Sequence, residues 1–240
     1  MEKERTGGCR TPAAGIIRGK KALLFDLFQT LTNTEIREHA RPHTAELLQI
    51  DPELWKDMVF HRSRDRLTGR LTDPVEIMRM MVHGIDPAVP IEKIRTAAEN
   101  RIERFKETLS SISPRVVATL SELSRRGHLL GLVSNADVTE TIGWRGSPLD
   151  GLFDTVVFSC EVGYAKPDEE IYRIALKRLG AEAKETAFIG DGGSGELEGA
   201  RRAGLATVLA AGVIRRIWPR DIEARINHAD GIVETIDELL

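Results

Sequence analysis

The sequence predicts an α/β fold, in which a parallel β-sheet has helices on both faces and an all-helical unit is inserted near its start. Three observations predict it. A short apolar run, residues 22–25, ends on Asp26, apolar runs alternate with amphipathic stretches from residue 114 onward, and residues 35–109 show apolar side chains at three- and four-residue spacing. Alternating strands and helices form right-handed βαβ units, and the strands of a parallel sheet are apolar on both faces.

Composition restricts the classes of function. The hydrophobic fraction of 41%, the charged fraction of 30% and a net charge of -3 are those of an ordinary soluble protein. This charge gives no reason to expect nucleic acid or an anionic membrane as a main partner. No apolar run approaches the roughly 20 residues that span a bilayer, and the first residues lack the apolar centre of a signal peptide. We therefore expect a cytoplasmic protein, with Cys9 and Cys160 reduced and unpaired.

The domain boundaries follow from changes in pattern. Residues 1–18 are rich in Gly, Thr, Arg and Pro without periodicity, which predicts a loosely ordered tail. The expected core consists of residues 19–33 and 110–240, and the helical unit of residues 34–109. Because this unit follows the first strand directly, we expect it to lie over the carboxyl edge of the sheet as a lid.

Prolines separate the helices of the inserted unit, at positions where a helix start tolerates the missing amide donor. The methionines 78, 80 and 81 are expected in the interior of this unit rather than on a substrate surface. The predicted helical stretches are HTAELLQI, PELWKDMVFHRSRDRL, PVEIMRMMVHGI and IEKIRTAAENRIERFKETL.

The rest of the chain alternates to its end. Glycines close the first two helices, as is common at helix C-termini. In order, and with the loops that they run into, we expect a helix at 114–127, strands at 128–137 and 153–163, a helix at 167–180, a strand at 185–195, a helix at 196–204, a strand at 205–212, and a short strand and helix within 228–240.

Polar side chains follow several of these strands. In open α/β sheets the carboxyl ends of the strands meet at the crevice where ligands bind. Two carboxylates held close repel each other, which a lysine or a divalent cation relieves, and Mg²⁺ prefers oxygen ligands. The pattern therefore suggests attack by a carboxylate on a phosphorus or carbon centre. The residues expected to converge are Asp26, Thr30, Ser134, Asn135, Lys166 and Asp191.

Four segments, in order and spacing, resemble the motifs of the haloacid dehalogenase-like hydrolase superfamily. They are FDLFQTL, LVSNAD, YAKPDEEIY and FIGDGGSGELEGARRAG. Each motif alone is weak evidence, but four in order on a matching pattern of strands and helices are specific. The resemblance covers nearly all of the chain after the tail. It implies a Rossmann-like core and identifies the helical unit as the alpha-helical cap of that family.

The resemblance also implies roles for individual residues. Asp26 matches the nucleophile that forms an aspartyl intermediate, and Ser134 matches the hydroxyl that binds the transferring group, with Asn135 beside it. Lys166 matches the lysine that neutralises nucleophile and substrate, and Asp191 matches the aspartate that binds Mg²⁺.

The resemblance gives weaker expectations at four further positions. Glu196 falls where a second acid usually sits, although acids are favoured in the first turn of any helix. Gln29 and Thr30 are expected beside the substrate, and at position 29 the family often has glycine. The backbone carbonyl of Phe28 matches a metal ligand of the family.

Phe28 departs from the phosphatase pattern, in which a second aspartate protonates the leaving group. A phenylalanine cannot transfer protons, and loss of a general acid typically costs about 10²- to 10⁴-fold in rate. Dehalogenases of the family have an aromatic residue at this position, because a halide needs no proton. They lack, however, the pair seen here as Gly190 and Asp191.

In the helical unit, Arg62, Arg66 and Arg70 recur every four residues. They form either a solvated basic helix face or a set of which Arg62 and Arg66 reach an anionic substrate group.

The function that the sequence favours is a Mg²⁺-dependent phosphatase of a small anionic metabolite, a monomer or homodimer, with an aspartyl-phosphate on Asp26. One alternative is metal-free dehalogenation of a 2-haloacid. A second alternative is a catalytically weak member that serves as a binding module.

Overall fold

The computed structural model describes residues 12–32 and 41–240. It contains one six-stranded parallel sheet in the order β3-β2-β1-β4-β5-β6, which confirms the predicted α/β class. The chain winds outward from β1 in one direction and then returns to wind in the other, so the direction changes between β1 and β4. The strands are β1 (Ala22–Phe25), β2 (Leu129–Ser134), β3 (Thr155–Phe158), β4 (Thr186–Gly190), β5 (Ala206–Ala210) and β6 (Gly231–Val233).

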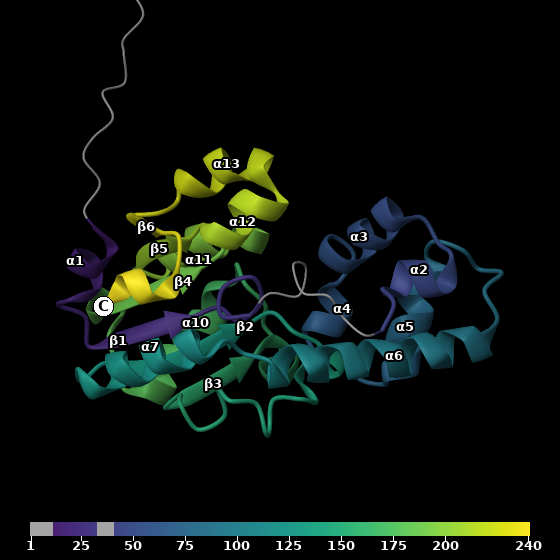
Figure 1. Ribbon diagram of the computed structural model, residues 1–240, viewed down its shortest axis with the longest axis horizontal. Coiled ribbons are helices and arrows are strands. Elements are labelled where there is room, and N and C mark those ends of the chain that lie inside the picture. Colours follow the sequence, from purple (N-terminus) through teal and green to yellow (C-terminus); the bar gives the residue numbers. More distant parts are fainter. Residues whose placement is uncertain (1–11, 33–40) are drawn as a thin grey trace, which may run out of the picture.

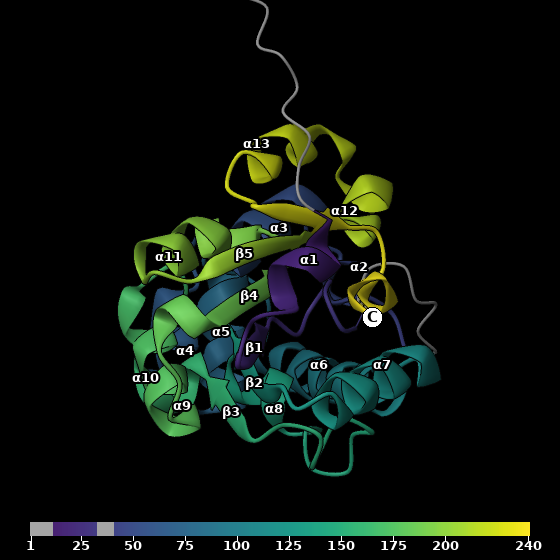
Figure 2. The same cartoon turned by 90° about the vertical axis from the view of Figure 1, so that its left-hand side faces the viewer.

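Helices cover both faces of the sheet (Figure 2). β1 is fully buried and its side chains alternate between two apolar cores: Leu23 and Phe25 join one, and Ala22 and Leu24 join the other. The first core is closed by α1 (Ala13–Ile17), α7 (Pro114–Arg125) and the short η4 (Ile236–Leu239). The second is closed by α10 (Glu169–Leu179), α11 (Glu196–Arg202), α12 (Gly212–Ile217) and α13 (Ile222–Ile226).

The predicted tail is wrong in its last part, because residues 13–17 form α1. Ala13 and Ile17 of this helix are buried against the first core. A helix of five residues is too short to show a periodic pattern, so packing rather than sequence pattern identifies it. Residues 1–11 of the predicted tail, including Cys9, lie outside the described residues.

The five described helices between β1 and α7 lie beyond the carboxyl ends of the strands (Figure 1). Aspartates precede Pro52 and Pro74, and their side chains accept hydrogen bonds from the first amides of the helices. Met78 and Met81 are fully buried among the apolar side chains of this segment, as expected, and Met80 packs against them. The helices are α2 (Thr44–Leu48), α3 (Pro52–Phe60), α4 (Arg64–Leu67), α5 (Pro74–His83) and α6 (Ile91–Ser110).

Two predicted elements divide where the chain changes direction. The helix expected at 52–67 breaks at residues 61–63 into α3 and α4. The strand expected at 153–163 ends at Phe158 and continues as the short α9 (Ser159–Val162). Residues 33–40, where the insertion was expected to begin, lie outside the described residues. Within the described part, no helix is both long and apolar enough to cross a membrane.

A buried ionic cluster joins the five helices to the sheet. The Arg66 guanidinium donates to Asp137 Oδ2 at 2.6 Å and lies 3.4 Å from Glu140 Oε1. Arg101 donates to the same glutamate at 2.5 Å. Asp137 caps α8 (Val138–Thr141), which begins shortly after the end of β2. We call these four residues the arginine–acid cluster; all are less than a tenth exposed.

Removing one member of this cluster leaves buried charges without a partner. We expect Arg66→Ala to lower the free energy of unfolding by about 3–5 kcal/mol. Arg62→Ala is the matched control, because Arg62 pairs with Asp57 at 3.1 Å on the surface, with 66% of its side chain exposed, and such pairs contribute about 0–1 kcal/mol. Urea denaturation of both variants measures the difference, and equal losses would contradict the assigned role of the cluster.

Candidate active site

The site is built where the sheet changes winding direction, at the ends of β1 and β4. These strands are direct neighbours, with Phe25 paired to Ile189, so Asp26 and Asp191 leave adjacent strands at the same edge. The amide of Asp26 donates to the carbonyl of Ile189 at 2.9 Å and continues the ladder past the last residue of β1. The two carboxylates are therefore placed by sheet register, not by loop conformation.

Lys166 connects two buried carboxylates. Its Nζ donates to Asp26 Oδ1 at 2.5 Å and to Glu196 Oε2 at 2.6 Å. The other oxygen of Asp26 accepts a hydrogen bond from Thr30 Oγ1 at 2.8 Å. Lys166, Asp26 and Glu196 are all less than a tenth exposed, so these interactions act in a medium of low polarity, where charge–charge energies are large.

The backbone of the fourth motif makes room for Glu196. Its Oε1 accepts a hydrogen bond from the amide of Gly192 at 2.8 Å. A Cβ atom at Gly190 would lie 2.2 Å from that same oxygen, so a side chain at this position would displace the Glu196 carboxylate. From its sequence position Glu196 could be either a second acid of the site or an ordinary first-turn residue, and the structure places it in the site.

Asp26, Asp191 and Glu196 form what we call the acidic triad. Each offers a carboxylate oxygen, and these oxygens all lie within 4.8 Å of one another. Three carboxylates at this spacing fit the oxygen donor set of a hard divalent cation such as Mg²⁺. The prediction that the Phe28 carbonyl completes that set stays a prediction.

Burial changes the proton affinity of these groups. It raises the pKa of Glu196 well above its usual range, and the neighbouring Asp26 and Asp191 add to the shift while Lys166 opposes it. Burial also raises the pKa of Asp26, again against Lys166. Burial alone would lower the pKa of Lys166, but its ion pairs with Asp26 and Glu196 outweigh that effect and raise it.

Asp191 has its own partners. Its Oδ1 accepts a hydrogen bond from the amide of Gly193 at 2.8 Å. The guanidinium of Arg225 donates from Nη1 to both Oδ2 and the backbone oxygen of Asp191, each at 2.8 Å. Sequence reasoning missed Arg225, because it lies in a five-residue helix between β5 and β6 that matches none of the four motifs.

The loop after β2 contributes two of the predicted residues. The Ser134 hydroxyl is fully buried and, among the described residues, has no hydrogen-bond partner. A buried hydroxyl without a partner is uncommon, and a ligand is one way to satisfy it. Asn135 bonds the backbone of Lys166: it donates to the Lys166 carbonyl at 2.9 Å and accepts from the Lys166 amide at 2.7 Å. Its predicted place beside the substrate stays a prediction.

The two arginines expected to bind substrate do not join this group. Arg66 is buried in the arginine–acid cluster, and Nη2 donates to the Val59 carbonyl. Its predicted contact with an anionic substrate is therefore corrected: its charge is already compensated by Asp137 and Glu140. Arg62 pairs with Asp57 at the surface. The four-residue spacing could not reveal this, because Arg62 lies in the break between α3 and α4 and shares no continuous helix with Arg66.

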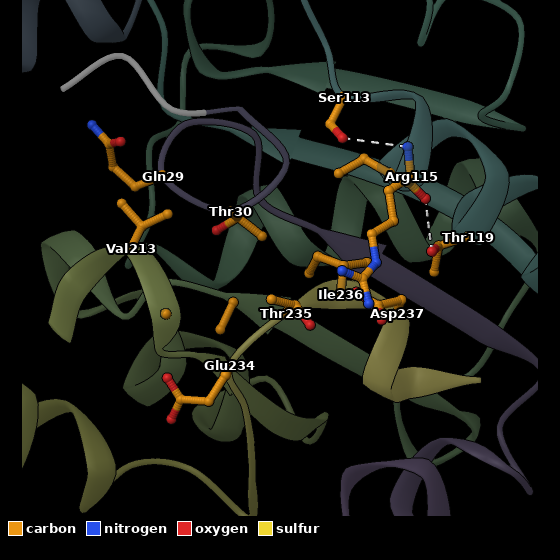
Figure 3. Close-up of a pocket in the computed structure, with 13 residues that line it drawn as sticks. Gln29, Thr30, Ser113, Arg115, Thr119, Val213, Glu234, Thr235, Ile236 and Asp237 are labelled. Atoms are coloured by element: carbon orange, nitrogen blue, oxygen red, sulfur yellow. Dashed lines mark hydrogen bonds and ion pairs between the residues drawn. The ribbon is translucent and has the colours of Figure 1, made fainter. Parts of the chain in front are cut away.

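A cavity of about 190 Å³ adjoins the site (Figure 3). Gln29 and Val213 lie on one side of it and Arg115 and Asp237 on the other. Thr30 lines this cavity and also bonds Asp26, but no member of the acidic triad lines it. Gln29, expected beside the substrate, lines it as well, in a left-handed backbone conformation with φ 65°. The cavity therefore lies beside Gln29 and Thr30, in the loop after β1, and not at the carboxylates of the acidic triad.

The chain is similar in sequence to a known family of hydrolases and to named phosphatases. The sequence model of one family, described as haloacid dehalogenase-like hydrolase, matches residues 20–204. A phosphoserine phosphatase from Thermus thermophilus is 38% identical over 180 residues, which cover 71% of each chain. A glyceraldehyde 3-phosphate phosphatase from Methanocaldococcus jannaschii is 28% identical over 197 residues, 78% of this chain and 83% of the other.

A solved structure of a dehalogenase with an intermediate complex superposes with a TM-score of 0.66 and 20% identity, covering 92% of this chain and 96% of the other. At that identity the likeness concerns the fold alone.

The raised pKa of Glu196 predicts how stability depends on pH. Between the unfolded and folded pKa values of this group the folded state binds more protons, so stability falls as pH rises. We expect the free energy of unfolding of metal-free protein to decrease as pH rises above 4.5, the ordinary pKa of a glutamate, and Glu196→Gln to flatten that decrease. Lys166 does not contribute near neutral pH, because both its ordinary pKa of 10.5 in the unfolded state and its raised pKa in the folded state lie far above that range. Urea denaturation across the pH range measures the slope.

Glu198→Gln is the control for this measurement, since Glu198 lies in the same helix but is exposed and pairs with Arg202. If the two variants show the same slope as the unsubstituted protein, Glu196 does not carry the pH dependence.

Proposed function

The chain belongs to the haloacid dehalogenase-like hydrolases, and we propose that it is a Mg²⁺-dependent phosphatase of a small phosphorylated metabolite. The observation that carries the proposal is the buried group formed by Lys166 and the acidic triad, which includes Asp26, at the carboxyl edge of the sheet. The sequence relatives named phosphatases favour this reaction over dehalogenation. We further propose that it acts in the cytoplasm as a monomer or homodimer.

In the proposed reaction a carboxylate oxygen of Asp26 attacks the phosphorus atom. The bond between phosphorus and the leaving oxygen breaks, and that oxygen keeps the electron pair. Water then attacks the phosphorus of the aspartyl-phosphate, which releases inorganic phosphate and restores Asp26. The free carboxylate is kept reactive by its two fixed neighbours, Lys166 and Thr30, which hold its orientation.

The other residues act on charge and position. Lys166 neutralises negative charge that develops on the substrate, at a place from which burial excludes water. The unpartnered hydroxyl of Ser134 is suited to bind an oxygen of the transferring group. Mg²⁺, held by the acidic triad and the Phe28 carbonyl, would supply charge neutralisation for the phosphoryl oxygens.

We propose that residues 34–109 form a cap that selects the substrate. Its helices lie beyond the carboxyl ends of the strands (Figure 1). Arg64 of α4 contacts Asp168, two residues after Lys166, at 3.0 Å. The proposed cap therefore contacts the loop that carries the lysine.

Phe28 narrows the class of substrate. The residue lies two positions after Asp26, where it provides no proton for the leaving group, and its ring packs edge-on against Phe105 with the ring centres 5.4 Å apart. A leaving group that is stable without protonation, such as the carboxylate of an acyl phosphate, does not need that proton. We therefore propose substrates with such leaving groups rather than simple alkyl phosphates.

Dehalogenation of a 2-haloacid is the second candidate, and Phe28 is the observation in its favour. It uses the same attack by Asp26, on carbon instead of phosphorus, and releases halide. This reaction requires no metal, so chelators distinguish it from phosphate release.

Phosphate release from a panel of phosphorylated metabolites, with Mg²⁺ or with chelator, tests the proposal. We expect turnover with Mg²⁺ that chelator removes and that Asp26→Asn reduces to background, because that variant has no nucleophilic oxygen of comparable charge. Asp150→Asn is the matched control, because Asp150 is an exposed aspartate outside the triad, and it should keep measurable turnover. Halide release from 2-haloacids with no phosphate release would favour the second candidate, and silence in both assays would favour a binding module.

A second prediction concerns Phe28 itself. We expect Phe28→Asp to raise turnover of an alkyl phosphate, relative to acetyl phosphate, by about tenfold or more, since a general acid contributes typically about 10²- to 10⁴-fold. Phe28→Leu removes the aromatic contact with Phe105 without adding a proton donor, and should leave the ratio unchanged. An unchanged ratio in Phe28→Asp would show that leaving-group protonation does not limit this enzyme.

A further inference from the structure

Arg225 is the one described residue outside the four motifs that forms an ion pair with the acidic triad. Its side chain is only 14% exposed. The guanidinium contacts Asp191 at two atoms, the backbone oxygen and Oδ2. This arrangement fixes both the carboxylate and the start of the loop that follows β4.

The surrounding backbone is shaped to admit the arginine. Gly192 has φ 82°, and a Cβ atom there would lie 3.1 Å from Cβ and Cγ of Arg225. The stem of Arg225 thus packs directly on the glycine loop. Its position next to Asp191 is a packed feature of the site and not a chance contact of a mobile side chain.

Arg225 is also connected to the proposed cap. The guanidinium lies over the ring of Trp218 at 5.8 Å. On the same tryptophan, Phe60 of α3 packs edge-on at 5.8 Å, and Nζ of Lys56 lies 5.7 Å from the ring centre. A continuous series of contacts therefore runs from α3 through Trp218 and Arg225 to Asp191.

The charge of Arg225 has a direct effect on cation binding. With all groups ionised, the triad has three negative charges, and Lys166 and Arg225 supply two positive ones. A fixed positive charge a few ångströms from a cation site opposes binding, because charge–charge energies are large where water is excluded. The affinity of a carboxylate site for divalent cations follows the number of uncompensated charges.

We propose that Arg225 is a positioning residue that holds Asp191 and lowers the divalent-cation affinity of the acidic triad, and that α3 acts on it through Trp218. The inference rests on the proposed metal dependence. It predicts that the cation is retained loosely and that the position of the proposed cap changes how strongly it is held.

Calorimetric titration of metal-free protein with Mn²⁺ tests the charge effect without any turnover. We expect Arg225→Gln to bind Mn²⁺ about tenfold more tightly than the unsubstituted protein, and Arg225→Lys, which keeps the charge, to bind within about threefold of it. The direction separates this role from a merely structural one, since loss of local structure weakens binding. Equal or weaker binding by Arg225→Gln overturns the inference.

A second pair of variants tests the connection to α3. Phe60→Ala removes the contact with Trp218, whereas Leu54→Ala removes another exposed apolar side chain of the same helix. We expect tighter Mn²⁺ binding, by about threefold, in Phe60→Ala only. Equal affinities in the two variants overturn the part played by α3.

The outcomes also separate this inference from the proposed function. If neither the unsubstituted protein nor any variant binds Mn²⁺, the proposed metal dependence fails and the inference fails with it. If the unsubstituted protein binds Mn²⁺ and Arg225→Gln does so no more tightly, only the inference fails.

Discussion

The structure of the site depends on keeping three carboxylates close together away from water. Such a group is unstable unless its charge is compensated, because burial and mutual repulsion both favour the protonated forms. The compensation comes from two directions: Lys166 reaches Asp26 and Glu196 from the loop before α10, and Arg225 reaches Asp191 from α13. Glycines at 190 and 192 leave the space that Glu196 and Arg225 occupy. The sheet register, the loop glycines, Lys166 and Arg225 therefore all help to keep the three carboxylates close together in a buried place.

The residues that follow strands could be predicted from the sequence, and those that reach the site from elsewhere could not. A parallel sheet brings the carboxyl ends of its strands to one edge, so Asp26 and Asp191 were predictable once the strands were recognised. Lys166 was predictable from its place in a motif. Arg225 was not, because a five-residue helix shows no periodicity and its residues match no motif.

The predictions for the helical segment were wrong for the same reason: sequence periodicity does not show which distant residues become neighbours in the fold. A four-residue spacing predicts a common face only within one unbroken helix, and the chain turns between Arg62 and Arg66. One arginine is therefore at the surface and the other is buried among Asp137, Glu140 and Arg101. Partners so distant in sequence become neighbours only through the fold, so pattern reasoning had no signal for them. The short α1 was missed for a related reason, since only its packing identifies it.

The contact between Phe28 and Phe105 has a consequence for how this chain can evolve. Phe105 belongs to α6, and the Arg101 guanidinium lies 4.8 Å from its ring centre, so Phe28 is part of a packed group that includes the arginine–acid cluster. A lineage that acquired an acid at position 28 would lose this aromatic contact at the same step. Packing around Phe105 thus makes an acid at position 28 a change in the stability of the fold as well as in the chemistry of the site.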